Sequence, residues 1–263
     1  MAIPLAMDLA VGHPDWQAFL VSMILTGFAG GLLMVTHKVR SPKINVREAF
    51  LLTTLIWIAM ALFAALPFYF SDLGISFTDA FFESMSGITT TGASVLTQVE
   101  QAPPGILIWR ALLQWLGGVG IVVMAMSVLP FLKVGGMQLF RTESSEKDKL
   151  LPRAASFCAS IGSIYLLLTL LCTISYMFGG LSLFDALAHA MTTISTGGFS
   201  TFDGSFARLQ DGAGLDNLPD WRGASNFEVN SGLLQWTAVL FMVLGALPFA
   251  LFLRALSGDF RSL

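Results

Sequence analysis

Two short stretches rich in threonine, serine and glycine interrupt an otherwise apolar sequence. The first is Gly87–Ser94 and the second is Thr193–Ser200, 106 residues later. Glycine permits backbone dihedrals that other residues avoid, so successive carbonyl oxygens can turn to the same side of the chain. Such carbonyls replace the water shell of a cation in membrane ion filters. We therefore interpret both stretches as re-entrant loops that present backbone carbonyls to a passing cation.

The two stretches belong to a longer internal repeat. Gly74–Ser94 aligned without gaps to Gly180–Ser200 gives nine identities over 21 positions. The apolar segment that follows repeats as well, because Leu112–Trp115 (LLQW) recurs as Leu233–Trp236. A loop that merely joins two interfacial helices would account for one copy. Two copies in matching contexts favour a pair of ion-lining loops.

The composition is that of an integral membrane protein. Of the 263 residues, 55% are hydrophobic and only 12% are charged, with a mean hydropathy of +0.73, whereas a soluble domain carries about a quarter charged residues. Runs without charge that reach about 20 residues are long enough to cross a bilayer as helices. The predicted spans are Gln17–Thr36, Ala49–Ser71, Ala111–Leu132, Ala154–Phe184 and Val229–Leu253.

A shorter, semi-apolar segment precedes each Thr/Gly stretch. Thr78–Ile88 and Leu183–Ile194 are each about half as long as a membrane-spanning helix. Asp79 and Asp185 fall in their first turns, where a carboxylate offsets the positive end of the helix dipole. The negative C-terminal ends would then point towards the ion path, which favours a cation.

The distribution of basic residues predicts the orientation in the membrane. Of the 14 Lys and Arg residues, 11 lie on one side of the predicted spans, and the positive-inside rule makes that side cytoplasmic. They are Lys38, Arg40, Lys43, Arg47, Lys133, Arg141, Lys147, Lys149, Arg153, Arg254 and Arg261. We therefore expect the N-terminus outside, the C-terminus in the cytoplasm and both Thr/Gly stretches towards the outer side.

The predicted fold class is an all-α integral membrane protein with two span–pore-helix–span repeats preceded by one helix. The predicted divisions are residues 1–46 with the leading transmembrane helix, residues 47–153 with the first repeat and a cytoplasmic link, and residues 154–263 with the second repeat.

The motifs resemble those of the Trk/Ktr/HKT superfamily of potassium transport subunits, and most closely the bacterial Trk-type (TrkH/TrkG-like) membrane subunits. The motifs that carry the resemblance are Asp79–Ser84, Thr89–Ala93, Leu113–Ile121, Val134–Leu139 and Gly197–Ser200. That family has four span–pore-helix–span repeats around one pseudo-fourfold potassium pore, half of which this chain would supply. Its members commonly dimerise.

The resemblance implies a potassium filter made of backbone carbonyls. The implied potassium ligands are the carbonyls of Thr90, Thr91, Thr196 and Gly197, and the residues that shape the filter are Gly92, Ala93, Gly198 and Phe199. No covalent cofactor is expected, and potassium is the transported ion.

Glu83 and Arg110 are the two charged residues that we expect to support the filter. Glu83 lies in the first half-helix, and an ionisable residue within a membrane is a functional hypothesis by default. Structural hydrogen bonding behind the filter is one interpretation, and direct contact with the ion is the other. Arg110 is expected to open the third span on the outer side, as an interface anchor or as the partner of Glu83 or of a loop acid.

The family pattern extends further than this sequence, which ends at Leu263 after the second repeat. We expect either a truncated subunit that lacks a C-terminal half, or two copies that assemble into one four-repeat pore. The expected setting is the bacterial inner membrane, in contact with lipid. The resemblance also implies a cytosolic nucleotide-binding regulatory subunit, which would reach the basic link Lys133–Arg153.

Two functional hypotheses follow for this chain. The first is a potassium-conducting membrane subunit. The alternative is a non-conducting scaffold that binds a full-length subunit or the cytosolic regulatory ring. An enzyme is not expected, because the sequence has no HExxH motif, Ser-His-Asp set or paired carboxylates at a membrane face. Nucleic-acid binding is not expected either.

Overall fold

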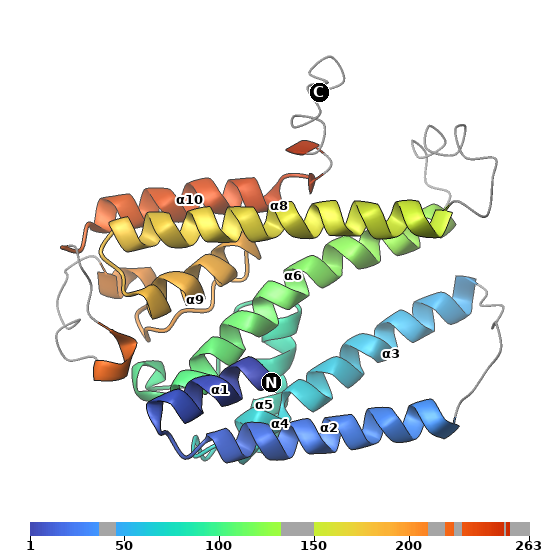
Figure 1. The fold of residues 1–263 in the computed structure, drawn as a ribbon, viewed down its shortest axis with the longest axis horizontal. Coiled ribbons are helices and arrows are strands. Elements are labelled where there is room, and N and C mark those ends of the chain that lie inside the picture. Colours follow the sequence, from blue (N-terminus) through green and yellow to red (C-terminus); the bar gives the residue numbers. More distant parts are fainter. Residues whose placement is uncertain (37–45, 133–149, 210–218, 224–227, 250, 253–263) are drawn as a thin grey trace.

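The computed structural model describes residues 1–36, 46–132, 150–209, 219–223, 228–249 and 251–252. Within these ranges the chain is helical and forms no strand (Figure 1). The motif Val134–Leu139 falls outside the described residues. Of the 11 basic residues that we assign to the cytoplasmic side, the structure describes two, Arg47 and Arg153. The orientation in the membrane therefore stays a prediction.

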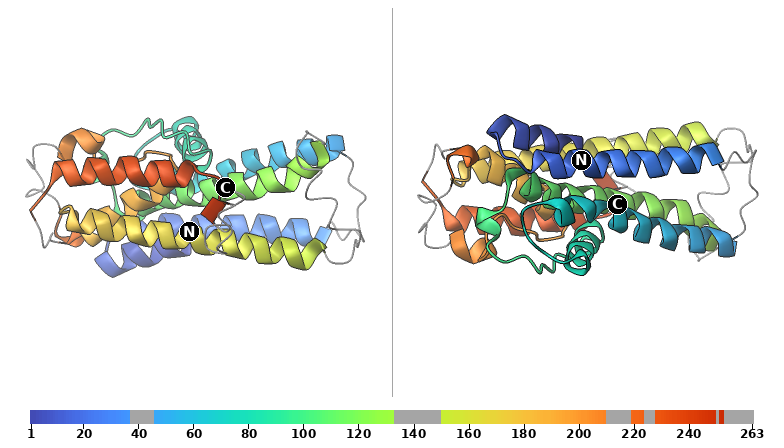
Figure 2. Two further views of the ribbon diagram at one scale, coloured as in Figure 1. Left: turned by 90° about the horizontal axis from the view of Figure 1, so that it is seen from above. Right: turned by 90° about the horizontal axis from the view of Figure 1, so that it is seen from below.

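The long helices lie side by side and alternate in direction along the long axis of the molecule, as Figures 1 and 2 show. The α-helices are α1 (Ala2–Val11), α2 (Trp16–Thr36), α3 (Val46–Ala64), α4 (Leu66–Phe70), α5 (Phe77–Ile88), α6 (Pro104–Leu132), α8 (Leu150–Phe178), α9 (Leu183–Ile194) and α10 (Ser231–Ala246). Three short 3₁₀ turns are η1 (Val99–Gln101), η3 (Ser205–Leu209) and η4 (Asp220–Arg222).

Four helical segments of the described chain are long and apolar enough to cross a membrane. They are Trp16–Thr36, Phe50–Phe70, Pro104–Ile121 and Ala159–Phe178. Within the fifth predicted span, Val229–Leu253, the helix α10 ends at Ala246, and Leu247 after it is extended. Pro248 explains this end, because a proline disfavours the helical conformation in the residue before it.

Three further details differ from the sequence-based expectation. The second predicted span is interrupted at Ala65, between α3 and α4, where Pro67 enters the first turn of α4 and cannot donate a helical N–H bond. The third begins at Pro104, so Arg110 lies within α6 and does not open it. The helix α1 was not predicted; it ends at Gly12, whose φ of 79° is the left-handed conformation that glycine tolerates best.

The apolar core consists of two clusters. One gathers side chains of α2 to α6 around Phe19, Phe68 and Ile106, and the other gathers those of α8, α9 and α10 around Tyr176 and Leu234. All five of these side chains are fully buried. The helix α6 contributes to both clusters, since its Trp115 and Val119 pack against the second. It therefore holds the two halves together.

The short helices α5 and α9 begin with the same hydrogen-bonded cap. The Ser76 hydroxyl accepts a bond from the Asp79 N–H (3.1 Å) and donates to the Asp79 carboxylate (2.7 Å). Ser182 and Asp185 repeat both bonds at 3.2 and 2.9 Å. This reciprocal arrangement satisfies N–H groups that a helix start leaves unpaired. Both helices have 12 residues, and each delivers its C-terminal end to one of the Thr/Gly stretches.

Candidate functional site

The two Thr/Gly stretches, which follow α5 and α9, have the same backbone shape. Thr90 and Thr196 have φ angles of 57° and 55°, and Gly92 and Gly198 have φ angles of 79° and 80°. The left-handed region is unfavourable for a β-branched residue such as threonine. Because the unfavourable conformation occurs at matching positions of both repeats, we infer that the shape is imposed by the surrounding structure. We call residues 89–94 the first loop and residues 195–200 the second loop.

Backbone N–H groups of the first loop bond back to the end of α5. The N–H groups of Thr91 and Gly92 both donate to the Ser86 carbonyl, at 2.9 and 3.4 Å. In a planar trans peptide the carbonyl points opposite to the N–H of the next residue. The carbonyls of Thr90 and Thr91 therefore point away from α5.

The second loop repeats this arrangement at the end of α9. The N–H groups of Gly197 and Gly198 donate to the Thr192 carbonyl, at 2.9 and 3.3 Å. By the same peptide geometry, the carbonyls of Thr196 and Gly197 point away from α9. All four carbonyls that the family resemblance implies as ligands are thus free of their own helix ends.

The two loops touch each other at their glycines. A side chain at Gly92 would collide with the carbonyl oxygen of Gly197, so only glycine fits this contact. Ala93 has its carbonyl turned back towards α5, where it accepts a bond from the Ser86 hydroxyl. The Ala93 carbonyl therefore points the opposite way from those of Thr90 and Thr91, which are directed away from α5.

An ion pair lies directly behind the first loop. Glu83 of α5 is fully buried, and its carboxylate accepts bonds from the guanidinium of Arg110 (2.8 Å), the hydroxyl of Ser94 (2.9 Å) and the N–H of Val95 (3.0 Å). A buried carboxylate needs such partners, because leaving it unpaired is costly. Both oxygens of the Glu83 carboxylate are thus engaged by neighbouring groups of the protein.

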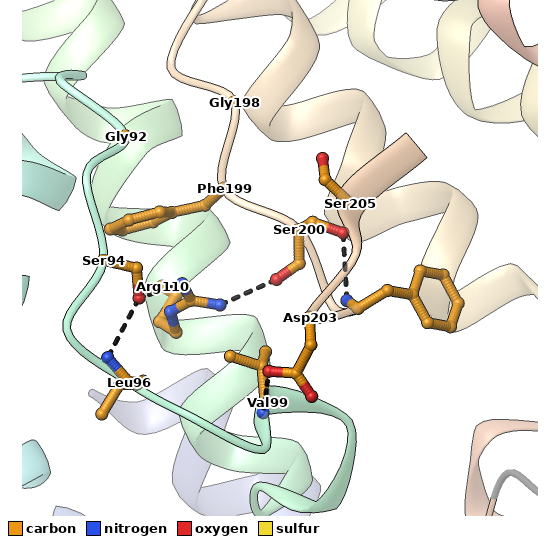
Figure 3. Close-up of a pocket in the computed structure, with 11 residues that line it drawn as sticks. Gly92, Ser94, Leu96, Val99, Arg110, Gly198, Phe199, Ser200, Asp203 and Ser205 are labelled. Atoms are coloured by element: carbon orange, nitrogen blue, oxygen red, sulfur yellow. Dashed lines mark hydrogen bonds between the residues drawn. The ribbon is translucent and has the colours of Figure 1, made fainter. Parts of the chain in front are cut away.

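Arg110 extends the same brace to the second loop. Its guanidinium donates to the Ser94 hydroxyl (3.1 Å) and to the Ser200 carbonyl (2.7 Å), and it lies 4.2 Å from the ring centre of Phe199. Figure 3 shows Arg110 between the two loops, with the Phe199 ring crossing from one to the other. One arginine of α6 therefore fixes both loops at once.

The second repeat has a different set of supporting contacts. His189 occupies the position that matches Glu83; its ring nitrogens bond to the Asp185 carbonyl (2.8 Å) and the Ser200 hydroxyl (3.0 Å). The buried Asp185 carboxylate accepts bonds from Arg222 (3.0 Å) and from Thr201. This role of Arg222 was not predicted from the sequence, where the one signal was a basic residue next to Trp221 in a polar loop.

Cavities lie on both sides of the loops. One of about 240 Å³ is lined by Gly92, Gly198 and Arg110, together with Asp203 (Figure 3). A second of about 160 Å³ lies between Thr90 and Thr196 and the helices that carry Tyr165 and Phe249. Within the described chain, no group of three or more His, Cys, Asp or Glu side chains is placed to hold a metal ion.

A carboxylate from α1 meets the start of α6. Asp8 is fully buried, and one of its oxygens accepts the N–H of Gly105 at 2.6 Å. The other oxygen has no hydrogen-bond partner within the described part of the chain. Burial raises the pKa of Asp8 to about 6, against the lowering effects of the Gly105 bond and of His13. This contact anchors α1 on the helix that carries Arg110.

Comparisons with known proteins point to one family. The family model described as TrkH, cation transport protein, matches residues 15–219. The Trk system potassium uptake protein TrkI of Halomonas elongata is 40% identical over 260 residues, which are 98% of this chain and 49% of that protein. The Trk system potassium uptake protein TrkH of Escherichia coli K12 is 40% identical over 209 residues, 78% of this chain and 43% of that protein.

A solved structure agrees with these matches. The crystal structure of the potassium transporter TrkH from Vibrio parahaemolyticus superimposes with a TM-score of 0.79 at 31% identity, over 98% of this chain and 48% of that one. The chain thus spans about half the length of the relatives it matches. The resemblance drawn from the motifs is confirmed: the chain is a helical membrane protein and belongs to the TrkH family of cation transport proteins, a family of transporters and not of enzymes.

Proposed function

We propose that this chain conducts potassium across the membrane and that its two loops form part of a carbonyl-lined filter. The observation that carries the proposal is the identical backbone shape of the two loops, with four carbonyls turned away from their helix ends. Relatives about 40% identical to this chain are named as potassium uptake proteins. In this proposal the ion-binding atoms are the carbonyl oxygens of Thr90, Thr91, Thr196 and Gly197.

The proposed mechanism is replacement of the ion's water shell. Carbonyl dipoles held in fixed positions compensate a potassium ion for the water that it loses on entering the filter. The C-terminal ends of α5 and α9, where the helix dipole is negative, add a favourable field for a cation. Gly92, Ala93, Gly198 and Phe199 shape the loops, while Glu83 and Arg110 hold them from behind.

The proposal includes the wider architecture. Residues 1–46 would form the leading segment, and residues 47–153 and 154–263 the two span–pore-helix–span repeats. Assembly with a second copy, or with a C-terminal half, would complete four quadrants around the pore. We place the chain in the bacterial inner membrane, with a cytosolic nucleotide-binding subunit as its regulatory partner.

Rubidium uptake by bacteria that lack their own potassium uptake systems tests the function. Cells that express this chain should accumulate rubidium, and Gly92→Ser and Gly198→Ser should each abolish that uptake. Gly92→Ser would collide with the Gly197 carbonyl, and Gly198→Ser would force a side chain into a left-handed conformation. Gly74→Ser is the matched control, because Gly74 also has a positive φ (64°) but lies outside both loops.

The outcomes separate the two hypotheses. Uptake that persists undiminished in both loop variants would remove the filter assignment. If the chain itself imports no rubidium but co-purifies with a full-length Trk subunit, the non-conducting scaffold is the better description.

A further inference from the structure

Gln114 of α6 lies between the two loops and is fully buried. Its side-chain oxygen accepts the N–H of Phe199 in the second loop at 3.0 Å. A side chain at Gly197 would collide with the amide group of Gln114, so the loop packs directly against it. On the other side, the Gln114 nitrogen faces the first loop, 3.6 Å from the position that a Cβ at Gly92 would occupy.

The bond from Phe199 fixes one peptide of the second loop. The peptide that joins Gly198 to Phe199 is trans, so its carbonyl points opposite to the N–H that Gln114 holds. The Gly198 carbonyl is therefore directed away from α6. Gly198 is exposed, whereas Gly197 and Phe199 on either side of it are buried. The Gly198 carbonyl, which is not one of the four implied ligands, thus belongs to an exposed residue of the second loop.

The other end of the Gln114 amide has no hydrogen-bond partner among the residues that the structure describes. Its nitrogen is buried without a hydrogen-bond acceptor, and burying an unsatisfied donor is unfavourable. An apolar side chain of similar size would avoid this cost. The hydrogen bond from the Phe199 N–H to the side-chain oxygen of Gln114 is the contact that offsets the cost of the unpaired nitrogen.

We propose that Gln114 is a positioning residue of the filter, which acts by orienting the Gly198–Phe199 peptide so that the Gly198 carbonyl faces the ion. The proposal rests on the proposed function and deepens it. It assigns a determinant of ion selectivity to a side chain of the first repeat that acts on the loop of the second. The repeat counterpart, Gln235 of α10, is exposed and touches neither loop through any described hydrogen bond, which makes it a matched control.

Three variants separate the hydrogen bond from the volume of the side chain. Gln114→Met keeps the size but removes the acceptor. Gln114→Glu keeps the acceptor, one helical turn from Arg110, whose charge compensates the new carboxylate. Gln235→Met makes the same change on the exposed counterpart. The readout is the ratio of rubidium to sodium uptake at equal amounts of folded protein in the membrane, because a purely structural role would lower both fluxes together.

We expect Gln114→Met to lower the rubidium-to-sodium ratio by about tenfold, since a single lost hydrogen bond corresponds to roughly that factor. Gln114→Glu should stay within about twofold of the wild type, and Gln235→Met should leave the ratio unchanged. A ratio that is unchanged in Gln114→Met, or lowered equally in Gln114→Met and Gln114→Glu, would overturn the proposal.

Hydrogen exchange keeps this test separate from that of the proposed function. In the purified protein the Phe199 amide should exchange slowly in the wild type and in Gln114→Glu, and faster in Gln114→Met. If the wild type imports no rubidium, the proposed function fails, yet the exchange pattern still decides whether Gln114 holds this peptide. Equal protection in all three proteins would show that it does not.

Discussion

The first and second loops have one backbone shape but different supports. In the first repeat a buried carboxylate on the short helix, Glu83, pairs with Arg110 of the following long helix. In the second, His189 occupies the matching position and bonds to Ser200, and the ion pair has moved to Asp185 and Arg222. The shape itself is made by bonds to the ends of α5 and α9, which are common to both repeats. The comparison teaches that the helix ends determine the loop conformation, while the side chains behind it vary in kind.

The largest effect on this difference between the two supports is expected from removing Arg110 from its ion pair with Glu83. Arg110→Met leaves the Glu83 carboxylate buried without its counter-ion, which typically costs about 3–5 kcal/mol. We expect a marked loss of folded protein, measured by thermal unfolding in detergent. Adding Glu83→His to this variant installs the residue type of the second repeat and should recover most of the loss. A double variant as unstable as Arg110→Met alone would show that the two supports are not interchangeable.

The caps of the two short helices offer a sharper contrast. Asp185→Asn removes the charge partner of Arg222, and hydrogen bonds to charged groups contribute about 1.5–3 kcal/mol. Asp79→Asn changes the equivalent cap in the first repeat, where the carboxylate is half-exposed and bonds to Ser76. There we expect less than about 1 kcal/mol, the scale of a carboxylate at an exposed helix start. Chemical denaturation of both variants in parallel measures the difference, and equal effects would contradict it.

The starts of the two following helices should differ in their response to pH. Asp8 from α1 meets α6, with its pKa raised to about 6 from an ordinary 3.8, whereas α10 starts with its own exposed cap, Asn230. At a pH between 3.8 and about 6, the Asp8 carboxyl is protonated more often in the folded state than in the unfolded state. The free energy of unfolding therefore rises as the pH falls from 7 to 5. Asp8→Asn should remove this part of the rise in melting temperature.

The control for the pH experiment is Asn230→Asp, which places a carboxylate at the exposed start of α10. It should add no dependence of the melting temperature between pH 7 and 5, because an exposed carboxylate keeps its ordinary pKa. Burial also raises the pKa of Asp15, which contributes to the pH dependence of both proteins. The contribution of Asp8 is therefore the difference between the melting-temperature curves of the wild type and Asp8→Asn. Parallel curves for these two proteins would remove the role given to Asp8.

The sequence was sufficient to predict the features that depend on local pattern. The short helices start and end within a residue of the predicted segments Thr78–Ile88 and Leu183–Ile194, because a serine cap and an apolar period define them locally. The pairing of Glu83 with Arg110 was one of the alternatives for Arg110, since a buried carboxylate requires a partner. Family membership followed from five short motifs between Asp79 and Ser200, four of them in the first repeat and its link.

What the sequence did not predict depends on contacts between distant segments. The bond from Phe199 to Gln114 joins residues 85 positions apart, and that from Arg222 to the Glu100 carbonyl joins residues 122 apart. No sequence spacing predicts that Gln114 or Arg222 makes these contacts. Gln114 did leave one signal, an amide repeated as Gln235 inside two apolar spans. The start of α6 was misplaced because Arg110 was taken for the edge of the span, although a paired arginine can lie inside a helix.

The helix α6 bears one face that serves both loops. Arg110 and Gln114 form hydrogen bonds with the second loop. Gly117 packs against the carbonyl of Ile88, the last residue of α5, and Gly118 packs against Ser195 at the start of the second loop. These positions recur every three or four residues and so form one stripe, while Leu116 is half exposed on another face. The helix would therefore tolerate many apolar replacements on its outer face and very few along the stripe. A change of sequence along this stripe would therefore alter the contacts of both loops together.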